Sequence, residues 1–269
     1  MHILFFHGGP GFNSNPERHL FFPLLEERGI RIEGWDEPSP LRPDGYQFTM
    51  NDTYSNALKS AESFFLNQTD NSEPVCLLCH SFGANVGTYL ARKYEDKIKK
   101  IIFITPGLAV QDADLKILKI GRDDYKDHDL SAYQELNEII ADYTGKFDEN
   151  TIRGFQHIAR NPRFFQYYWT DTEKMQEYFQ YFADPGFSFD LETFFHTRKS
   201  FFTTDNGQIN VPAACIFGSE DPVISADITI QQVRKMFVKS NIYHIDGTGH
   251  YPHIECADKC LDIICSECG

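Results

Sequence analysis

Short apolar runs recur along the chain, and most of them end in glycine or polar residues. The first occupies residues 1–6 and leads into the loop His7-Gly8-Gly9-Pro10-Gly11. Runs of this length without a polar face are typical of strands that are covered on both sides, as in parallel sheets. The pattern predicts further strands at residues 30–35, 75–79, 101–104, 213–217 and 242–245.

Segments with apolar residues at helical spacing separate most of these strands. The predicted helices cover residues 16–28, 51–66, 84–94, 226–238 and 256–266. Pro23 lies inside the first of them, so we expect regular helix only from that residue on, and Gly29 is a suitable stop. Alternating strands and helices predict an α/β fold, with a mostly parallel sheet and helices on both of its faces.

The alternation is interrupted in the middle of the chain. Residues 108–207 contain no convincing buried strand, and 16 of the 39 aromatic residues lie between Phe155 and Phe202. We therefore predict one α/β core domain made of residues 1–107 and 208–269. The helical, aromatic-rich segment 108–207 is predicted to form a cap inserted into it.

Charge and composition narrow the possible partners. The chain has 25 basic and 39 acidic residues and a net charge of −14, which disfavours binding to nucleic acids and to anionic membranes. It has no apolar run of 18 residues, and its start lacks the cationic segment of a signal peptide. Seven cysteines, an odd number, fit a reducing environment, so we expect a cytoplasmic protein.

The segment Cys79-His80-Ser81-Phe82-Gly83 lies where a predicted buried strand becomes a helix. A nucleophile elbow, usually written G-x-S-x-G, needs this context, because a tight turn holds the serine hydroxyl out beside a helix N-terminus. Gly83 satisfies the need for a small residue, whereas Cys79 is larger than the usual glycine. The pattern predicts Ser81 as a nucleophile.

The loop His7–Gly11 follows the first strand and is rich in glycine. Attack on a carbonyl creates a negative oxygen, which backbone N–H groups can stabilise if they approach closely. Pro10 has no N–H, so we predict Gly9 and Phe82 as the donors. His7, Gly8 and Gly11 are predicted to support the loop.

Two further loops follow the strands at 213–217 and 242–245. They contain Asp221 and His250, which gives the chain order Ser81, Asp221, His250. A serine nucleophile needs a base, and the base needs an anion that fixes its tautomer. The carboxyl ends of parallel strands meet at one edge of a sheet, so we expect the three side chains to meet there.

These features resemble the α/β-hydrolase superfamily over residues 1–107 and 208–269, with the insertion at the position of that family's cap. The resemblance implies Ser81 as nucleophile, His250 as base, Asp221 as acid, and Gly9 and Phe82 as oxyanion donors. It also implies that the antiparallel strands with which this fold usually starts are missing. The loop His7–Gly11 resembles the HGGPG loop of prolyl iminopeptidases, but their elbow resembles G-G-S-W-G, which Cys79 and His80 do not match.

The sequence leaves alternatives for the catalytic base, acid and nucleophile. His253 and His80 are other possible bases, and Glu220 and Asp246 are other possible acids. A cysteine nucleophile at Cys79 is disfavoured, because side chains 79 and 80 point to opposite faces of a strand and do not meet.

The C-terminal cysteines raise the question of a metal. They are Cys256, Cys260, Cys265 and Cys268. On a helix Cys256 and Cys260 share one side, whereas Cys265 and Cys268 fall on roughly the opposite side, so one straight helix cannot gather four zinc ligands. We predict no metal site and no cofactor.

The sequence therefore predicts a serine hydrolase that cleaves an ester, thioester or amide bond of a small, largely apolar substrate through an acyl-enzyme. The aromatic residues expected to face the site are Phe164, Phe165, Tyr168, Trp169, Phe182 and Phe187. An aminopeptidase is the first alternative, with Glu173, Glu177, Asp184 or Glu192 available to bind an ammonium group. A non-catalytic ligand-binding receptor on the same fold is the second.

Overall fold

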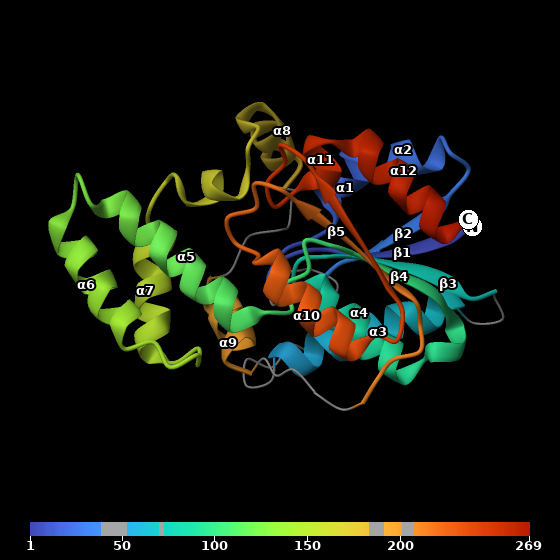
Figure 1. Ribbon diagram of the computed structural model, residues 1–269, viewed down its shortest axis with the longest axis horizontal. Coiled ribbons are helices and arrows are strands. Elements are labelled where there is room, and N and C mark those ends of the chain that lie inside the picture. Colours follow the sequence, from blue (N-terminus) through green and yellow to red (C-terminus); the bar gives the residue numbers. More distant parts are fainter. Residues whose placement is uncertain (39–52, 70–72, 183–190, 201–206) are drawn as a thin grey trace.

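Six parallel strands form the centre of the computed structural model (Figure 1), which describes residues 1–38, 53–69, 73–182, 191–200 and 207–269. The strands are β1 (His2–Phe6), β2 (Arg31–Trp35), β3 (Val75–His80), β4 (Ile98–Ile104), β5 (Ala213–Gly218) and β6 (Ser240–Ile245). Their order is β2-β1-β3-β4-β5-β6. Every neighbouring pair is parallel, so the described residues add no antiparallel strand to this sheet. The predicted fold class is confirmed.

Helices cover both faces of the sheet. Figure 1 shows α3 (Thr53–Thr69), α4 (Gly83–Lys93) and α10 (Ala226–Met236) on one face, and α1 (Asn15–Leu20), α2 (Phe22–Glu26), α11 (Pro252–Glu255) and α12 (Ala257–Cys268) on the other. In β1, Leu4 and Phe6 belong to the core under the first group, whereas Ile3 and Phe5 belong to the core under the second. This alternation explains why β1, β3 and β5 are apolar at almost every position.

Two helical segments differ from the prediction by more than a few residues at their ends. The segment predicted as one helix over 16–28 is two short helices, α1 and α2, which meet at Phe21. Pro23 is the second residue of α2, where its missing N–H has no helical partner to lose. The short helix α11 is not apparent from the sequence pattern.

Between β4 and β5 the described chain is helical, as predicted. It contains α5 (Val110–Tyr125), α6 (Leu130–Ala141), α7 (Glu149–Ala159), a 3-10 helix (Phe164–Tyr168), α8 (Thr172–Phe182) and α9 (Leu191–Ser200). In Figure 1, α5, α6 and α7 project beyond the end of the sheet, and they share a small apolar core of their own. Helix α8 instead packs on α1, where Tyr178 donates a 2.9 Å hydrogen bond to Glu17 Oε1.

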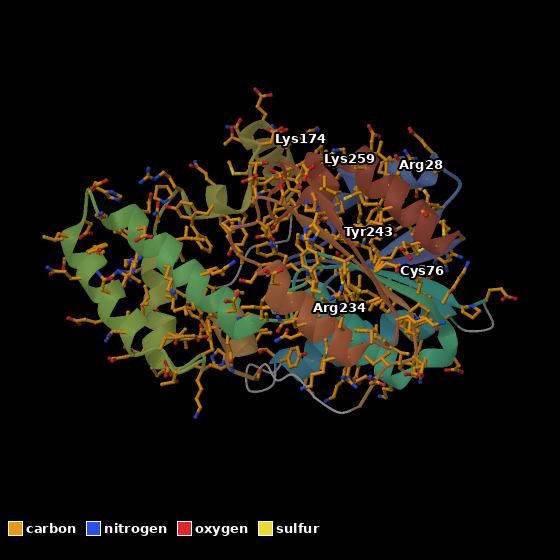
Figure 2. All side chains as sticks on the ribbon, viewed as in Figure 1. Arg28, Cys76, Lys174, Arg234, Tyr243 and Lys259 are labelled. Atoms are coloured by element: carbon orange, nitrogen blue, oxygen red, sulfur yellow. The ribbon has the colours of Figure 1, made fainter. Side chains whose placement is uncertain are left out.

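Side chains fill the space between the sheet and both helical layers (Figure 2). At the free edge of the sheet, the Tyr243 hydroxyl of β6 donates to Glu267 of α12, which also pairs with Lys100. In the described part of the chain, no helix combines the length and apolar character needed to cross a bilayer.

Candidate active site

Ser81 lies in a strained turn at the end of β3. Its φ of +48° falls in the left-handed region, which residues with a side chain rarely adopt. The next helix, α4, begins two residues later at Gly83. A Cβ on Gly83 would lie 2.1 Å from the Phe6 carbonyl oxygen, so only glycine fits there. The turn therefore has the strand-to-helix form of a nucleophile elbow.

Cys79 departs from the small residue usual at its position, and the fold accommodates it through a second glycine. A Cβ added to Gly87, one turn into α4, would lie 2.4 Å from the Cys79 Sγ and 2.9 Å from Ile101 Cδ1. The sulfur therefore occupies the space that a side chain at position 87 would need. Burial raises the pKa of the Cys79 thiol well above its usual value, which disfavours a thiolate nucleophile here.

We expect Gly87→Ala to lower the free energy of unfolding by about 1–3 kcal/mol, because it overpacks this contact. Replacing Cys79 by alanine in the Gly87→Ala background should restore more than half of that loss, since the sulfur is the nearest obstacle. Urea denaturation of the wild type, both single variants and the double variant measures the coupling. Purely additive losses would show that the two positions are not in contact.

The side chains of Ser81, His250 and Asp221 form one continuous hydrogen-bonded series. His250 Nε2 lies 2.9 Å from Ser81 Oγ, and His250 Nδ1 lies 2.8 Å from Asp221 Oδ2. A carboxylate only accepts, so Nδ1 carries the proton and Nε2 is free to accept from the serine hydroxyl. Asp221 is held in turn by the backbone N–H groups of Val223 and Ile224, which donate to its Oδ1.

The backbone of His250 is fixed from two sides. Its carbonyl oxygen accepts hydrogen bonds from Thr105 Oγ1 at 2.9 Å and His80 Nε2 at 3.0 Å. Its N–H donates to the Tyr168 carbonyl at 2.8 Å. The histidine loop is therefore attached both to the sheet and to the helical segment between β4 and β5.

Glu255 strengthens that second attachment, although it was not predicted from the sequence. Its carboxylate accepts from the N–H groups of Gly249, Thr170 and Asp171 and from the Thr170 hydroxyl. One side chain thus joins the loop before His250 to the segment before α8. The sequence contains one signal for Glu255, which is its position five residues after His250. An acidic residue that is merely exposed on the C-terminal helix would give the same pattern.

The other histidines and acids considered from the sequence take different places. His80 donates to the His250 carbonyl, and its pKa is lowered well below the usual value by burial and by nearby His253 and His250. His253 is fully buried and lies 3.5 Å from Glu17 Oε1. Glu220 and Asp246 are exposed. It is therefore His250 and Asp221 that the fold brings to Ser81.

The glycine-rich loop after β1 is held next to the elbow. The His7 ring stacks on Trp35 with centroids 5.1 Å apart, and its Nε2 accepts from the Glu37 N–H at 3.1 Å. The Glu37 carboxylate accepts from the Gly11 N–H at 2.7 Å. Gly9 has a φ of +136°, a conformation that favours glycine.

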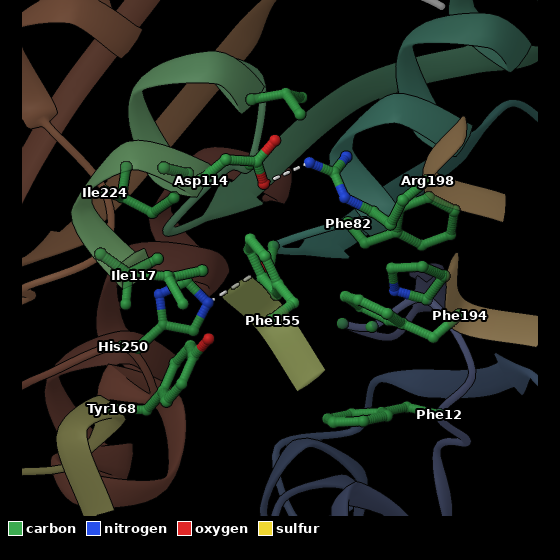
Figure 3. Close-up of a pocket in the computed structure, with 18 of the residues that line it drawn as sticks. Phe12, Phe82, Asp114, Ile117, Phe155, Tyr168, Phe194, Arg198, Ile224 and His250 are labelled. Carbon is green, nitrogen blue, oxygen red and sulfur yellow. Dashed lines mark hydrogen bonds and ion pairs between the residues drawn. The ribbon is translucent and has the colours of Figure 1, made fainter. Parts of the chain in front are cut away.

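A cavity of about 270 Å³ opens above the elbow. Ser81, His250, Gly8, Gly9 and Phe82 all line it, so the residues predicted as nucleophile, base and oxyanion donors share one space. Most of the remaining wall is apolar, and Figure 3 shows aromatic rings around His250. Its aromatic residues are Phe12, Phe82, Phe155, Phe164, Phe165, Tyr168, Phe194 and Tyr251.

One buried ion pair interrupts the apolar wall. Arg198 of α9 binds the Asp114 carboxylate of α5, and both side chains are less than a tenth exposed (Figure 3). Burial raises the pKa of Asp114, while Arg198 opposes that shift. Neither residue was identified from the sequence, because they are 84 positions apart and no local pattern marks them. The pair gives the cavity a fixed polar wall.

The aromatic residues predicted to face the site divide into three groups. Phe164, Phe165 and Tyr168 line the cavity. Trp169 does not, because it is buried in the core and stacks on Tyr251 with centroids 4.1 Å apart. Phe182 lies one layer behind the cavity wall, in contact with the ring of Phe12. Phe187 lies outside the described residues.

The family model for the alpha/beta hydrolase fold matches residues 1–257. A search of curated proteins found no significant match. Several solved structures are similar over nearly the whole chain, at low sequence identity.

An esterase from Exiguobacterium antarcticum has a TM-score of 0.63 at 17% identity, with 99% of this chain and 91% of the other covered. The serine hydrolase CarC, involved in carbazole degradation, has a TM-score of 0.62 at 14% identity, with 99% and 90% covered. An epoxide hydrolase from Bacillus megaterium has a TM-score of 0.59 at 16% identity, with 98% and 92% covered. At these identities the similarity shows the fold.

Proposed function

This chain belongs to the α/β-hydrolase fold family, and we propose that it is a serine hydrolase that cleaves an ester of a small, largely apolar molecule. The observation that carries the proposal is the series of hydrogen bonds from Ser81 Oγ through His250 to Asp221. This arrangement activates a hydroxyl for attack on a carbonyl carbon. A hydrolase of this family would use such an activated hydroxyl to cleave an ester.

The proposed reaction has two steps. His250 Nε2 takes the proton of Ser81 as the hydroxyl attacks the carbonyl, and it returns that proton to the leaving group. The acyl-enzyme is then hydrolysed by water that His250 activates. Asp221 stabilises the imidazolium in both steps, and the Gly9 and Phe82 N–H groups stabilise the oxyanion.

The helical segment between β4 and β5 acts as the cap in this proposal. It supplies Phe155, Phe164 and Phe165 to the cavity wall, and Tyr168 holds the His250 backbone. A wall built mainly from rings favours apolar or aromatic acyl or alcohol groups. The cavity of about 270 Å³ suits a small substrate.

Epoxide hydrolases of this superfamily use an aspartate as nucleophile, and this chain has Ser81 at that position, so an epoxide hydrolase is disfavoured. An aminopeptidase would need an acid in the cavity for the substrate ammonium. Glu173 and Glu192 are exposed, Glu177 pairs with Lys174, and Asp184 lies outside the described residues. Asp114 does line the cavity, but Arg198 neutralises it.

A panel of p-nitrophenyl esters and aminoacyl arylamides tests this choice. We expect hydrolysis of esters with medium-length or aromatic acyl groups, at a kcat/KM at least about tenfold above that for acetate, because each buried methylene adds apolar contact. We expect no turnover of free aminoacyl arylamides. Turnover of these arylamides, but not of N-blocked ones, would favour the aminopeptidase. Tight ligand binding without turnover of any substrate would favour the receptor.

A further inference from the structure

Three buried polar side chains come together behind the nucleophile elbow, away from the catalytic cavity. They are Glu17 of α1, His80 at the end of β3 and His253 of α11, and each is at most 1% exposed. One potential ligand atom from each lies within 4.8 Å of the other two. They form the only group of three or more such ligands among the residues that the structure describes.

The cluster contains more hydrogen-bond acceptors than donors. His80 Nε2 donates to the His250 carbonyl, so in the neutral ring its Nδ1 carries a lone pair, and that atom is buried without a partner. Glu17 Oε2 is also a buried acceptor without a partner. Both ring nitrogens of His253 are buried and form no hydrogen bond, and Nε2 lies 3.5 Å from Glu17 Oε1. A buried lone pair left unsatisfied is costly, so a cation between these atoms would stabilise them.

Two of the three side chains, His80 and Glu17, are oriented as metal ligands usually are. A metal-binding histidine usually donates its second ring N–H to a carbonyl or carboxylate, as His80 does to His250. The Glu17 carboxylate is oriented by the Tyr178 hydroxyl at 2.9 Å. Two histidines and one glutamate are a ligand set that zinc accepts.

From this geometry we propose that Glu17, His80 and His253 bind one Zn²⁺ ion. The ion would join three segments that are distant in the sequence: helix α1, the strand end before Ser81 and the helix after His250. Its role is structural, since the cluster does not line the catalytic cavity. Zinc ligand atoms lie about 3.4 Å apart in a tetrahedral site, so the side chains must close by up to about 1.4 Å when the ion binds.

Because the cluster is closed to solvent, the ion would enter as the chain folds. The test is therefore to unfold the protein in chelator, to refold it with or without ZnCl2, and to measure bound zinc by elemental analysis after dialysis. We expect about one zinc per chain in the wild type. At a hundredfold excess over Kd, zinc should raise the Tm by about 5–10 °C.

Two near-isosteric variants, Glu17→Gln and His253→Asn, should lose the zinc and the Tm shift. The double variant Cys256→Ser/Cys265→Ser is the matched control, because both thiols are partly exposed and could bind zinc adventitiously. It should keep both properties. Cobalt in place of zinc should give visible bands of a nitrogen and oxygen site, without thiolate charge transfer.

A wild type that refolds without bound zinc would overturn the proposal and would assign the cluster to a metal-free hydrogen-bond network. Zinc that persists in both Glu17→Gln and His253→Asn, but is lost in the cysteine variant, would overturn it as well. The measurement does not depend on catalysis, so it is independent of the proposed hydrolase activity. If His253→Asn does not refold, Glu17→Gln and the wild-type zinc content still decide the result.

Discussion

Ser81→Ala should abolish labelling by a fluorophosphonate probe and lower ester hydrolysis by about 10⁴-fold or more. The alanine removes the oxygen that lies 2.9 Å from His250 Nε2 and leaves the ring without a proton to accept. In hydrolases with this arrangement, loss of the nucleophile or the base has effects of that size. Gel fluorescence after probe treatment and a p-nitrophenyl ester assay measure the two quantities.

The roles of the other members of the series follow from the same assays. His250→Ala should lose labelling as Ser81→Ala does, and Asp221→Asn should lower the rate by about 10³–10⁴-fold, because the amide no longer fixes the Nδ1–H tautomer. Ser240→Ala, at the opposite edge of the sheet, is the matched control and should label normally. Labelling that survives in Ser81→Ala but not in Cys79→Ala would move the nucleophile to the cysteine.

A large loss of stability is expected for Gly83→Ala. The new Cβ would lie 2.1 Å from the Phe6 carbonyl oxygen and 2.8 Å from that of His7, and both are backbone atoms that cannot rotate away. We expect the free energy of unfolding to fall by more than about 4 kcal/mol, which would leave little soluble protein. Urea denaturation and the soluble yield are the measurements.

Gly29→Ala is the control for this prediction. Gly29 has a φ of +74°, but no atom lies within 4 Å of the position of its Cβ, so only backbone strain of about 1 kcal/mol applies. Equal losses in the two variants would show that the close approach of β1 to the elbow is not the cause. A stable Gly83→Ala protein that fails to bind the probe would instead show that the turn opens without loss of the fold.

Much of the fold is encoded in local patterns along the chain. All six strands were predicted, and β1, β3 and β5 show the clearest pattern because they bury both faces and are apolar at almost every position. The prediction of Ser81, Asp221 and His250 followed from strand ends, since parallel strands of one sheet must bring their following loops to the same edge. The structure places these three side chains in contact, and their catalytic roles remain a proposal.

Contacts between distant segments carry no such local signal. Tyr168 is partly buried and lines the cavity, whereas the adjacent Trp169 is buried and does not line it. No local pattern in the sequence marks two side-chain pairs, Asp114 with Arg198 and Glu17 with His253. These side chains come together only when their helices pack. The contact of the Cys79 sulfur with Gly87 likewise has no local signal in the sequence.

The sequence by itself therefore determined the layers, the strand ends and the chemical identity of the three side chains that meet there, because these depend on periodicity and on the parallel sheet. The tertiary structure decided which rings face the cavity, where its ion pair lies and which polar groups are buried behind Ser81. Those features depend on the packing of side chains from separate helices, and that packing has no period along the chain.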